Sequence, residues 1–260
     1  MNDIPLLDPL LLSLRVAALA TLFSSLGALL LAWKLSRRRG PLPAVLDAFC
    51  ALPLVLPPTV VGYYLIVLLG RHGLVGRWLA EAGISLIFSW QGAVVAATVV
   101  VFPLIYKSAR AALEQVDSRL EDAARTLGAG EWRIFLTISL PLAWRGIFAG
   151  IMLAFARGMG EFGATLMLAG NIPGRTQTLA LAIYDAFQAG NDARATLLVL
   201  VASGLCMGLL AGAELLMRLR RRRRAVTRTS SLSRQAGGLP PADARGVRPA
   251  GMLRDRRPAC

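Results

Sequence analysis

Five runs of mostly apolar residues, each close to the length that crosses a lipid bilayer, constrain this chain more than any other feature. They lie at about 10–33, 45–69, 91–106, 145–168 and 195–217. A helix needs about 20 such residues to span the hydrocarbon core, and it satisfies its backbone hydrogen bonds internally. We therefore expect an all-α polytopic membrane protein with five transmembrane helices in a domain over 1–217. The hydrophobic fraction of 55% favours the same class.

The distribution of basic residues predicts the orientation of these spans. Of the net charge of +14, most comes from 13 arginines set against two aspartates from Arg218 onward. Other basic residues follow the first span or lie in 107–141, and cytoplasmic segments carry the excess of Lys and Arg. We expect a multi-pass protein of the cytoplasmic membrane with its N-terminus outside, and with 107–141 and the C-terminus in the cytoplasm.

The basic tail, 218–260, is rich in Ser, Pro, Gly and Arg and offers no core, so we expect it to be disordered. It is either a solvated appendage or a segment attracted to the anionic headgroups of membrane lipid. Nucleic acid is not expected as a partner, because the domain before the tail carries little net charge.

Composition also excludes several kinds of site. The single histidine and the three scattered cysteines provide neither a metal-ligand cluster nor a disulfide framework. The sequence has no GxxxxGK[ST] nucleotide-binding loop and no catalytic triad. We expect no enzyme activity, no metal and no cofactor bound by this chain. A transporter of this kind is driven either by an ion gradient or by a partner subunit.

The segment 107–141 is charged and lies between apolar runs, so it cannot itself cross the bilayer. Ser118 followed by Glu121 is typical of a capping box that starts a helix. Gly128 can adopt the left-handed conformation that ends a helix, and Pro141 limits a second helix or kinks its entry into the next span. We predict a helix, a glycine turn and a second helix at the membrane surface, shaped for close approach by another protein. The alternative is an ordinary amphipathic loop.

The spacing within this segment resembles the cytoplasmic loop of ABC importer permeases, which reads Glu-Ala-Ala, three residues, Gly, nine residues, Ile-x-Leu-Pro. The matching residues here are Asp122, Ala123, Ala124, Gly128, Ile138, Leu140 and Pro141. Asp122 departs from the usual glutamate, which keeps the charge and shortens the side chain. The resemblance implies the permease core of a type I ABC importer, with a loop that couples to a separate ATPase subunit.

Polar and irregular features inside the apolar runs are candidates for a translocation pathway. Arg157 and Glu161 lie four residues apart near the middle of the fourth run. There they can pair on one helix face, and ionisable groups at this depth indicate function. The alternative is a structural ion pair. Pro57 and Pro58 interrupt the second run, which either lines a cavity or makes a packing kink. The further candidates are the hydroxyl groups of Thr59 and Thr165.

Two longer stretches, Pro53–Gly70 and Gly160–Tyr184, are similar to the permeases of molybdate importers. Sulfate permeases carry a closely related pattern, so a sulfate or tungstate permease is an alternative. The resemblance implies a homodimer, two ABC ATPase subunits that bind ATP-Mg, and a periplasmic or lipid-anchored oxyanion-binding protein. Asn171 and Arg175 are candidate contacts for that binding protein. Two other classes stay open: an ion-coupled secondary transporter using Arg157 and Glu161 as a relay, and a structural subunit.

Overall fold

The computed structural model describes residues 7–38, 40–212 and 215, and the expected disorder of the tail falls outside these residues. Every regular element in this described part is a helix. In chain order the helices are α1 (Leu7–Ser36), α2 (Pro41–Val55), α3 (Pro58–Leu69), α4 (Leu74–Glu81), α5 (Trp90–Glu114), α6 (Ser118–Thr126), α7 (Glu131–Ile134), the π-helix η1 (Phe135–Ser139), α8 (Leu140–Met159), α9 (Gly163–Ala169) and α10 (Leu179–Gln188). A further helix covers Asp192–Gly212. The all-α fold class is confirmed.

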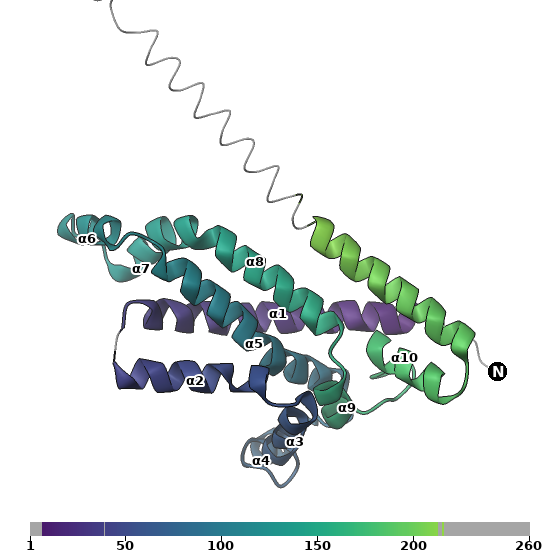
Figure 1. The fold of residues 1–260 in the computed structure, drawn as a ribbon. Coiled ribbons are helices and arrows are strands. Elements are labelled where there is room, and N and C mark those ends of the chain that lie inside the picture. Colours follow the sequence, from purple (N-terminus) through teal and green to yellow (C-terminus); the bar gives the residue numbers. More distant parts are fainter. Residues whose placement is uncertain (1–6, 39, 213–214, 216–260) are drawn as a thin grey trace, which may run out of the picture. The chain divides into compact units, whose positions relative to one another are not determined.

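Three long helices, α1, α5 and α8, pack along one another and form the centre of the domain (Figure 1). Small side chains make this close packing possible. A Cβ added to Gly146 of α8 would lie 2.6 Å from the Cβ of Ala112 on α5, and one on Gly150 would lie 2.4 Å from the Cβ of Ser108. Small residues let helix backbones approach closely where apolar surroundings give no hydrophobic driving force.

Among the described residues, four helices are long and apolar enough to cross a membrane: α1, α5, the continuous helix Glu131–Met159, and Asp192–Gly212. A fifth crossing results if α2 and α3 are counted together as one broken span. The chain bends by 112° between these two helices. Pro58 begins α3, where its missing N–H is no loss. The run predicted over 45–69 is thus two helices at a steep angle.

The chain between 145 and 168 is also divided. Helix α8 ends at Met159, and α9 begins at Gly163 after a short break. This corrects the expectation that Arg157 and Glu161 lie on one helix face, because Glu161 lies beyond the end of α8. The two broken runs therefore place short helices, α3 and α9, against each other.

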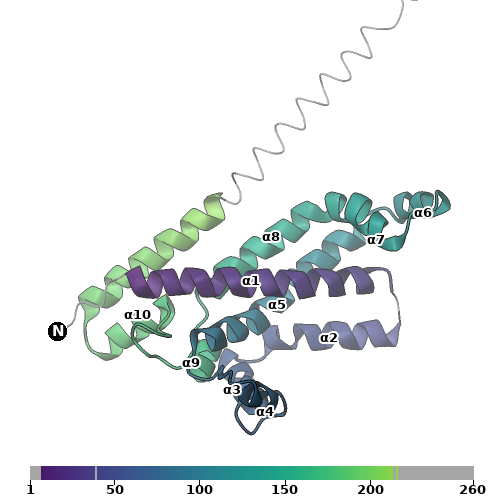
Figure 2. The ribbon, with the colours of Figure 1, turned by 180° about the vertical axis from the view of Figure 1, so that it is seen from behind.

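The two ends of the bundle differ in what they carry. Helices α6 and α7 lie at the end where α1 finishes, whereas α10 lies near the end where α1 begins (Figures 1 and 2). The segment 118–139 and the loop around 171–178, which both contain candidate site residues predicted from sequence, are thus at opposite ends.

Candidate functional site

Helix α6 starts differently from the sequence prediction. Asp117 is the N-cap residue, and its Oδ1 accepts a hydrogen bond from the backbone N–H of Arg119 at 3.0 Å. Ser118 is the first helical residue, so the predicted capping box is wrong. Glu121 is released from that role because Asp117, one residue earlier, already satisfies the helix start.

Glu121 instead lies buried at the junction of three segments. Its Oε1 accepts hydrogen bonds from Arg37 Nη2 at 2.9 Å and from Ser139 Oγ at 2.8 Å. Arg37 follows the end of α1, and the same Nη2 also donates to the carbonyl of Val116 at 2.9 Å. The Glu121 side chain is 6% exposed, whereas that of neighbouring Asp122 is 66% exposed. The two adjacent acids therefore have different environments.

The exposed acid belongs to a second cluster, centred on Arg125. Its guanidinium makes two hydrogen bonds with the Glu131 carboxylate, at 2.6 and 3.0 Å, and one with Asp122 at 2.6 Å. The hydrogen bonds to Glu131 and then to Asp122 raise the pKa of Arg125 above its ordinary value. This cluster joins α6 to α7 across the turn at the protein surface.

Gly128 has a φ of +80°, the left-handed conformation predicted for it. The N–H of Gly128 bonds to the carbonyl of Arg125, and that of Ala129 bonds to the carbonyl of Ala124. This pair of bonds is the Schellman arrangement that closes a helix C-terminus. A Cβ at Gly128 would meet nothing within 4 Å, so the requirement for glycine is conformational rather than steric.

The turn is followed by one continuous helical segment that changes its winding. After α7, residues Phe135–Ser139 form a π turn, and α8 then begins with Pro141 in its first turn. A proline ring clashes with the carbonyl four residues earlier in a regular α-helix, and a π turn relieves such crowding at a single place. The wide turn also presents Ser139 to Glu121, where the serine is buried.

The exposed surface of this region, called here the α6–η1 segment (118–139), carries apolar side chains beside the charged cluster. Leu127 at the turn is 88% exposed, and Ala123 of the motif is exposed as well. Trp132 and Leu136 are exposed on α7 and η1. The remaining motif residues are half-buried Ala124, Ile138 and Leu140 and exposed Pro141. A helix–turn–helix with this exposed face can dock into a groove, or against a helix, of another protein.

Arg157 and Glu161 do form an ion pair, with 2.8 Å between Nη1 and Oε2. The Glu161 side chain is 1% exposed and that of Arg157 is 39% exposed. Glu161 Oε1 accepts a hydrogen bond from the backbone N–H of Ala164 at 3.0 Å, in the first turn of α9. The carboxylate therefore holds the break between α8 and α9 in shape while its charge is balanced by Arg157.

The proline break lies beside this one. A Cβ added to Gly163 would be 2.9 Å from the Cβ of Pro58 and 3.2 Å from the backbone nitrogen of Thr59. Pro57 and Thr59 are exposed, whereas Thr165 is buried, with a hydroxyl that has no hydrogen-bond partner in the described part of the chain. The structure thus brings together pathway candidates from the second and fourth runs.

The two candidates in the loop around 171–178 differ from each other. The side chain of Asn171 donates to Asp185 at 3.4 Å and accepts from Gln177 at 3.0 Å. Arg175 is exposed beside an open pocket that also includes Arg15. Asn171 is therefore part of the scaffold of the loop, and Arg175 is available at its surface.

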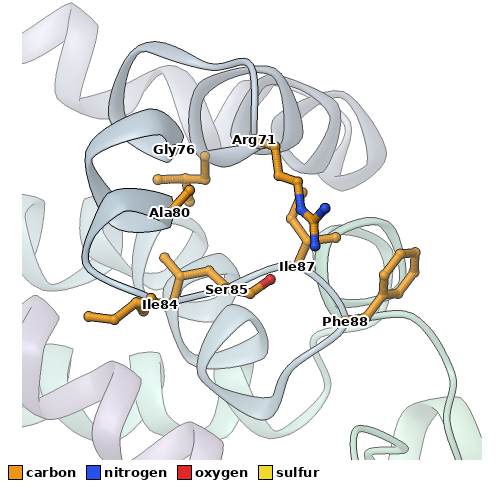
Figure 3. A pocket seen from close by; sticks show the side chains of 10 residues that line it. Arg71, Gly76, Ala80, Ile84, Ser85, Ile87 and Phe88 are labelled. Atoms are coloured by element: carbon orange, nitrogen blue, oxygen red, sulfur yellow. The ribbon is translucent and has the colours of Figure 1, made fainter.

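A larger cavity lies between α3, α4 and the segment before α5, and sequence analysis did not single it out. It encloses about 660 Å³ and includes Arg71 and Ser85 as polar lining residues. Figure 3 shows the Arg71 side chain on the wall opposite Gly76 and Ala80, reaching toward Ile87. Neither Arg157 nor Glu161 is among the residues that line this cavity.

Sequence reasoning missed Arg37 and Ser139 and gave Glu121 the wrong partner. Arg37 precedes Glu121 by 84 positions and Ser139 follows it by 18. No periodicity or local motif links residues that far apart. The basic run after α1 includes Arg37, but such a run by itself indicates only orientation.

These features define a multi-pass helical membrane protein with an exposed docking-shaped segment at one end. The sequence profile of a family described as "Binding-protein-dependent transport system inner membrane component" matches residues 24–226. The chain belongs to this family. It is therefore a multi-pass inner-membrane subunit of an ABC importer, a kind of subunit without ATPase activity, and the family implies ATPase and binding-protein partners.

Individual relatives agree with this family. The molybdenum transport system permease protein ModB of Escherichia coli (strain K12) is 50% identical over 215 residues, covering 82% of this chain and 94% of the relative. The sulfate transport system permease protein CysT of Escherichia coli (strain K12) is 37% identical over 176 residues, covering 68% and 64%. A solved structure of the MetNI methionine ABC transporter in an inward-facing conformation has the same fold, with a TM-score of 0.64 at 18% identity over 82% of this chain and 95% of that one.

Proposed function

We propose that this chain is the permease subunit of an ATP-driven molybdate importer. The observation that carries the proposal is the 50% identity to a molybdenum permease, which extends over 94% of that relative. The similarity to a sulfate permease is lower and covers less of both proteins. Sulfate and tungstate, which are also tetrahedral oxyanions, are the competing substrates.

The proposed assembly contains two copies of this chain, two ATPase subunits that bind ATP-Mg, and an oxyanion-binding protein, periplasmic or lipid-anchored. Two copies related by a twofold axis form the commonest kind of symmetric assembly and would enclose a path between them. Exposed apolar residues on α2 and α3, such as Phe49, Tyr63 and Tyr64, leave surface for a second copy or for lipid.

In this proposal the α6–η1 segment lies in the cytoplasm and docks into a groove of the ATPase. Asp122, Ala123, Ala124 and Gly128 form the first part of the coupling loop, and Ile138, Leu140 and Pro141 form its close. Exposed Leu127 at the turn supports this role because it offers an apolar contact at the tip. Closure of the ATP-bound subunits would bring the two loops together and tilt the spans from inward-facing to outward-facing. Hydrolysis would reset them.

The broken helices are the proposed place where substrate passes. A dianion needs a path with hydrogen-bond donors and little fixed negative charge, and the Arg157 guanidinium balances the Glu161 carboxylate there. Pro57, Pro58 and exposed Thr59 lie at the neighbouring break, and Thr165 contributes a buried hydroxyl. In this proposal the pathway binds the substrate with low affinity, and the binding protein supplies the selective capture.

The opposite end of the bundle is then the docking face for the binding protein, with the N-terminus outside and the C-terminus in the cytoplasm. Exposed Arg175 is the proposed direct contact. Asn171 acts indirectly, through its hydrogen bonds to Gln177 and Asp185. Arg71, in the cavity shown in Figure 3, adds a second cationic group for contact with acidic residues of that partner.

The test is ATP-dependent uptake of labelled molybdate into vesicles that contain the complete complex, with tungstate and sulfate as competitors. We expect the uptake of labelled molybdate to require ATP and the binding protein. Unlabelled molybdate should inhibit this uptake at a lower concentration than sulfate does. Preferential uptake of sulfate would move the chain to the sulfate branch. Uptake that persists without ATP and collapses with the proton gradient would instead identify a secondary transporter, with Arg157 and Glu161 as its relay.

A further inference from the structure

We propose that Glu121 is a positioning residue that fastens the α6–η1 segment to the end of α1 and the start of α8, so that these three parts move as one body. The proposal rests on the function proposed above, in which an ATPase pushes this segment. It assigns a role to the buried acid beside the family motif rather than to Asp122 within it.

The geometry of the carboxylate carries the proposal. Glu121 Oε1 accepts from Arg37 and from Ser139, at 2.9 and 2.8 Å, and Oε2 lies 3.8 Å from Arg125. Arg37 lies just after the end of α1 and Ser139 at the end of η1, on either side of α6 in the chain. One buried side chain is therefore hydrogen-bonded to a group at the end of α1 and to one in η1, and it lies near a cation of its own helix.

Arg37 doubles the connection. Its Nη2 contacts both Glu121 and the carbonyl of Val116, which precedes α6. The guanidinium thus holds the backbone at the entrance of α6 and a side chain one turn inside it. A displacement of α6 cannot occur without either moving the end of α1 or breaking both contacts.

An aromatic cluster connects the same elements beside the charged groups. Trp33 of α1 lies with its ring centroid 4.7 Å from that of Phe135 in η1 and 5.4 Å from that of Trp132 in α7. Such ring pairs add to the burial of apolar area. The apolar contact gives the tie stiffness, and the Glu121 contacts give it direction and register.

Burial distinguishes this tie from the other charged cluster of the segment. Attraction between charges is strong where water is excluded and weak where it is not, and exposed pairs contribute little. The Arg125–Asp122–Glu131 cluster is largely exposed, whereas Glu121 is not. Force applied to α6 is therefore expected to reach the membrane helices through Glu121.

The first experiment measures substrate taken up per ATP hydrolysed by the complete complex in vesicles. Glu121→Gln and Arg37→Gln are expected to lose most of the uptake while ATP hydrolysis continues, and Arg37→Lys is expected to regain part of it because an ammonium group can donate to both oxygens. The matched control is Glu114→Gln, which removes an exposed i,i+4 pair at the end of α5. Equal coupling in Glu121→Gln, Glu114→Gln and the unmodified complex would overturn the proposal.

The second experiment keeps the proposal testable if a variant assembles poorly. Spin labels are placed at Lys34→Cys and Thr126→Cys in a chain whose Cys50, Cys206 and Cys260 are serine, diluted with unlabelled subunit so that only distances within one copy are read. The distance between the labels should be narrow and unchanged when ATP binds. A shift larger than the width of the distribution would show that α1 and α6 move separately, and would overturn the proposal.

A single label at Thr126→Cys, measured between the two copies, separates this inference from the proposed function. If the intersubunit distance changes with ATP while the Lys34–Thr126 distance stays fixed, both are supported. If the intersubunit distance changes and the internal one changes as well, only the tie fails. If ATP changes neither the intersubunit distance nor uptake, the ATP-driven mechanism fails, and the proposed role of the tie fails with it.

Discussion

Two glutamates are buried in the described part of the chain, and each pairs with a partly exposed arginine, Glu121 with Arg37 and Glu161 with Arg157. Their partners lie at very different separations. Glu161 is bonded only to groups three and four residues away, and it shapes one break between helices. Glu121 is bonded across 84 and 18 positions and connects separate elements. The same pair of residue types therefore makes a local shape in one place and a long-range connection in the other.

The two pairs also differ in the groups that still contact the glutamate once its arginine is removed. Glu161 is almost fully buried and has one other donor, the N–H of Ala164. If Arg37 is lost, Glu121 keeps the Ser139 hydroxyl as a donor and the Arg125 guanidinium 3.8 Å away as a cation. We therefore expect the first pair to matter more for stability and the second to matter more for coupling.

The largest effect is expected from Arg157→Ala, which leaves the Glu161 charge buried without its partner. Loss of one member of a buried pair costs about 3 kcal/mol or more of unfolding free energy. Arg157→Ala/Glu161→Gln should regain most of that loss, because the amide oxygen still accepts from Ala164. Thermal unfolding of the purified complex in detergent measures both. A cycle in which the single effects simply add would remove the pair from the account.

A smaller loss of stability, about 2 kcal/mol, is expected for Arg37→Ala, because Glu121 retains both the Ser139 hydroxyl and the nearby Arg125 cation. Its effect on uptake per ATP should nevertheless exceed that of any other single change with a similar loss of stability. The same unfolding measurement, paired with vesicle uptake, checks the ranking. A complex that unfolds earlier but remains fully coupled would show that the two glutamates have equivalent, purely structural roles.

Gly128→Thr tests the turn on which the loop tip depends. A β-branched residue in the left-handed conformation costs about 1–2 kcal/mol, so we expect faster hydrogen exchange in α6 and weaker coupling. The matched control is Gly130→Thr, because Gly130 has a φ of −69° and occupies the N-cap of α7, a position that threonine favours. Similar behaviour of the two variants would contradict the turn assignment.

The smallest effect on stability is expected from Asp122→Asn. The Asp122 side chain is 66% exposed, and surface substitutions of this kind stay within about 0.5 kcal/mol. Any change in uptake per ATP would then come from contact with the ATPase and not from folding. A clear loss of thermal stability would show that the exposed acid, and not only its buried neighbour, supports the loop.

Much of the fold was predictable because it depends on local composition. Apolar runs predicted the all-α membrane class, the glycine at 128 predicted the turn, and the four-residue spacing predicted the pair Arg157–Glu161. Each of these depends on residues within about one helical turn or one span of each other. The family motif located the exposed segment for the same reason.

The rest depended on tertiary contacts. The spacing of Ser118 and Glu121 fits a capping box, but Asp117 is the N-cap residue of α6, and Glu121 bonds to the distant Arg37. The prolines indicated an interruption, but not the 112° bend between α2 and α3, nor that Pro58 lies against Gly163, which is far away in the sequence. The apolar pattern across 145–168 predicted one continuous span, but the helix breaks between Met159 and Gly163. The glycines there permit either a helix or a break, so the pattern did not distinguish the two.

The π turn at Phe135–Ser139 has a consequence for chain length. It holds one residue more than an α turn, and it takes up that residue within a single wide turn. Removing one residue there would restore regular α-helical hydrogen bonding, with little change in the direction that the side chains of α8 face. The chain thus carries an extra residue beside Glu121 without rotating the membrane helix that follows.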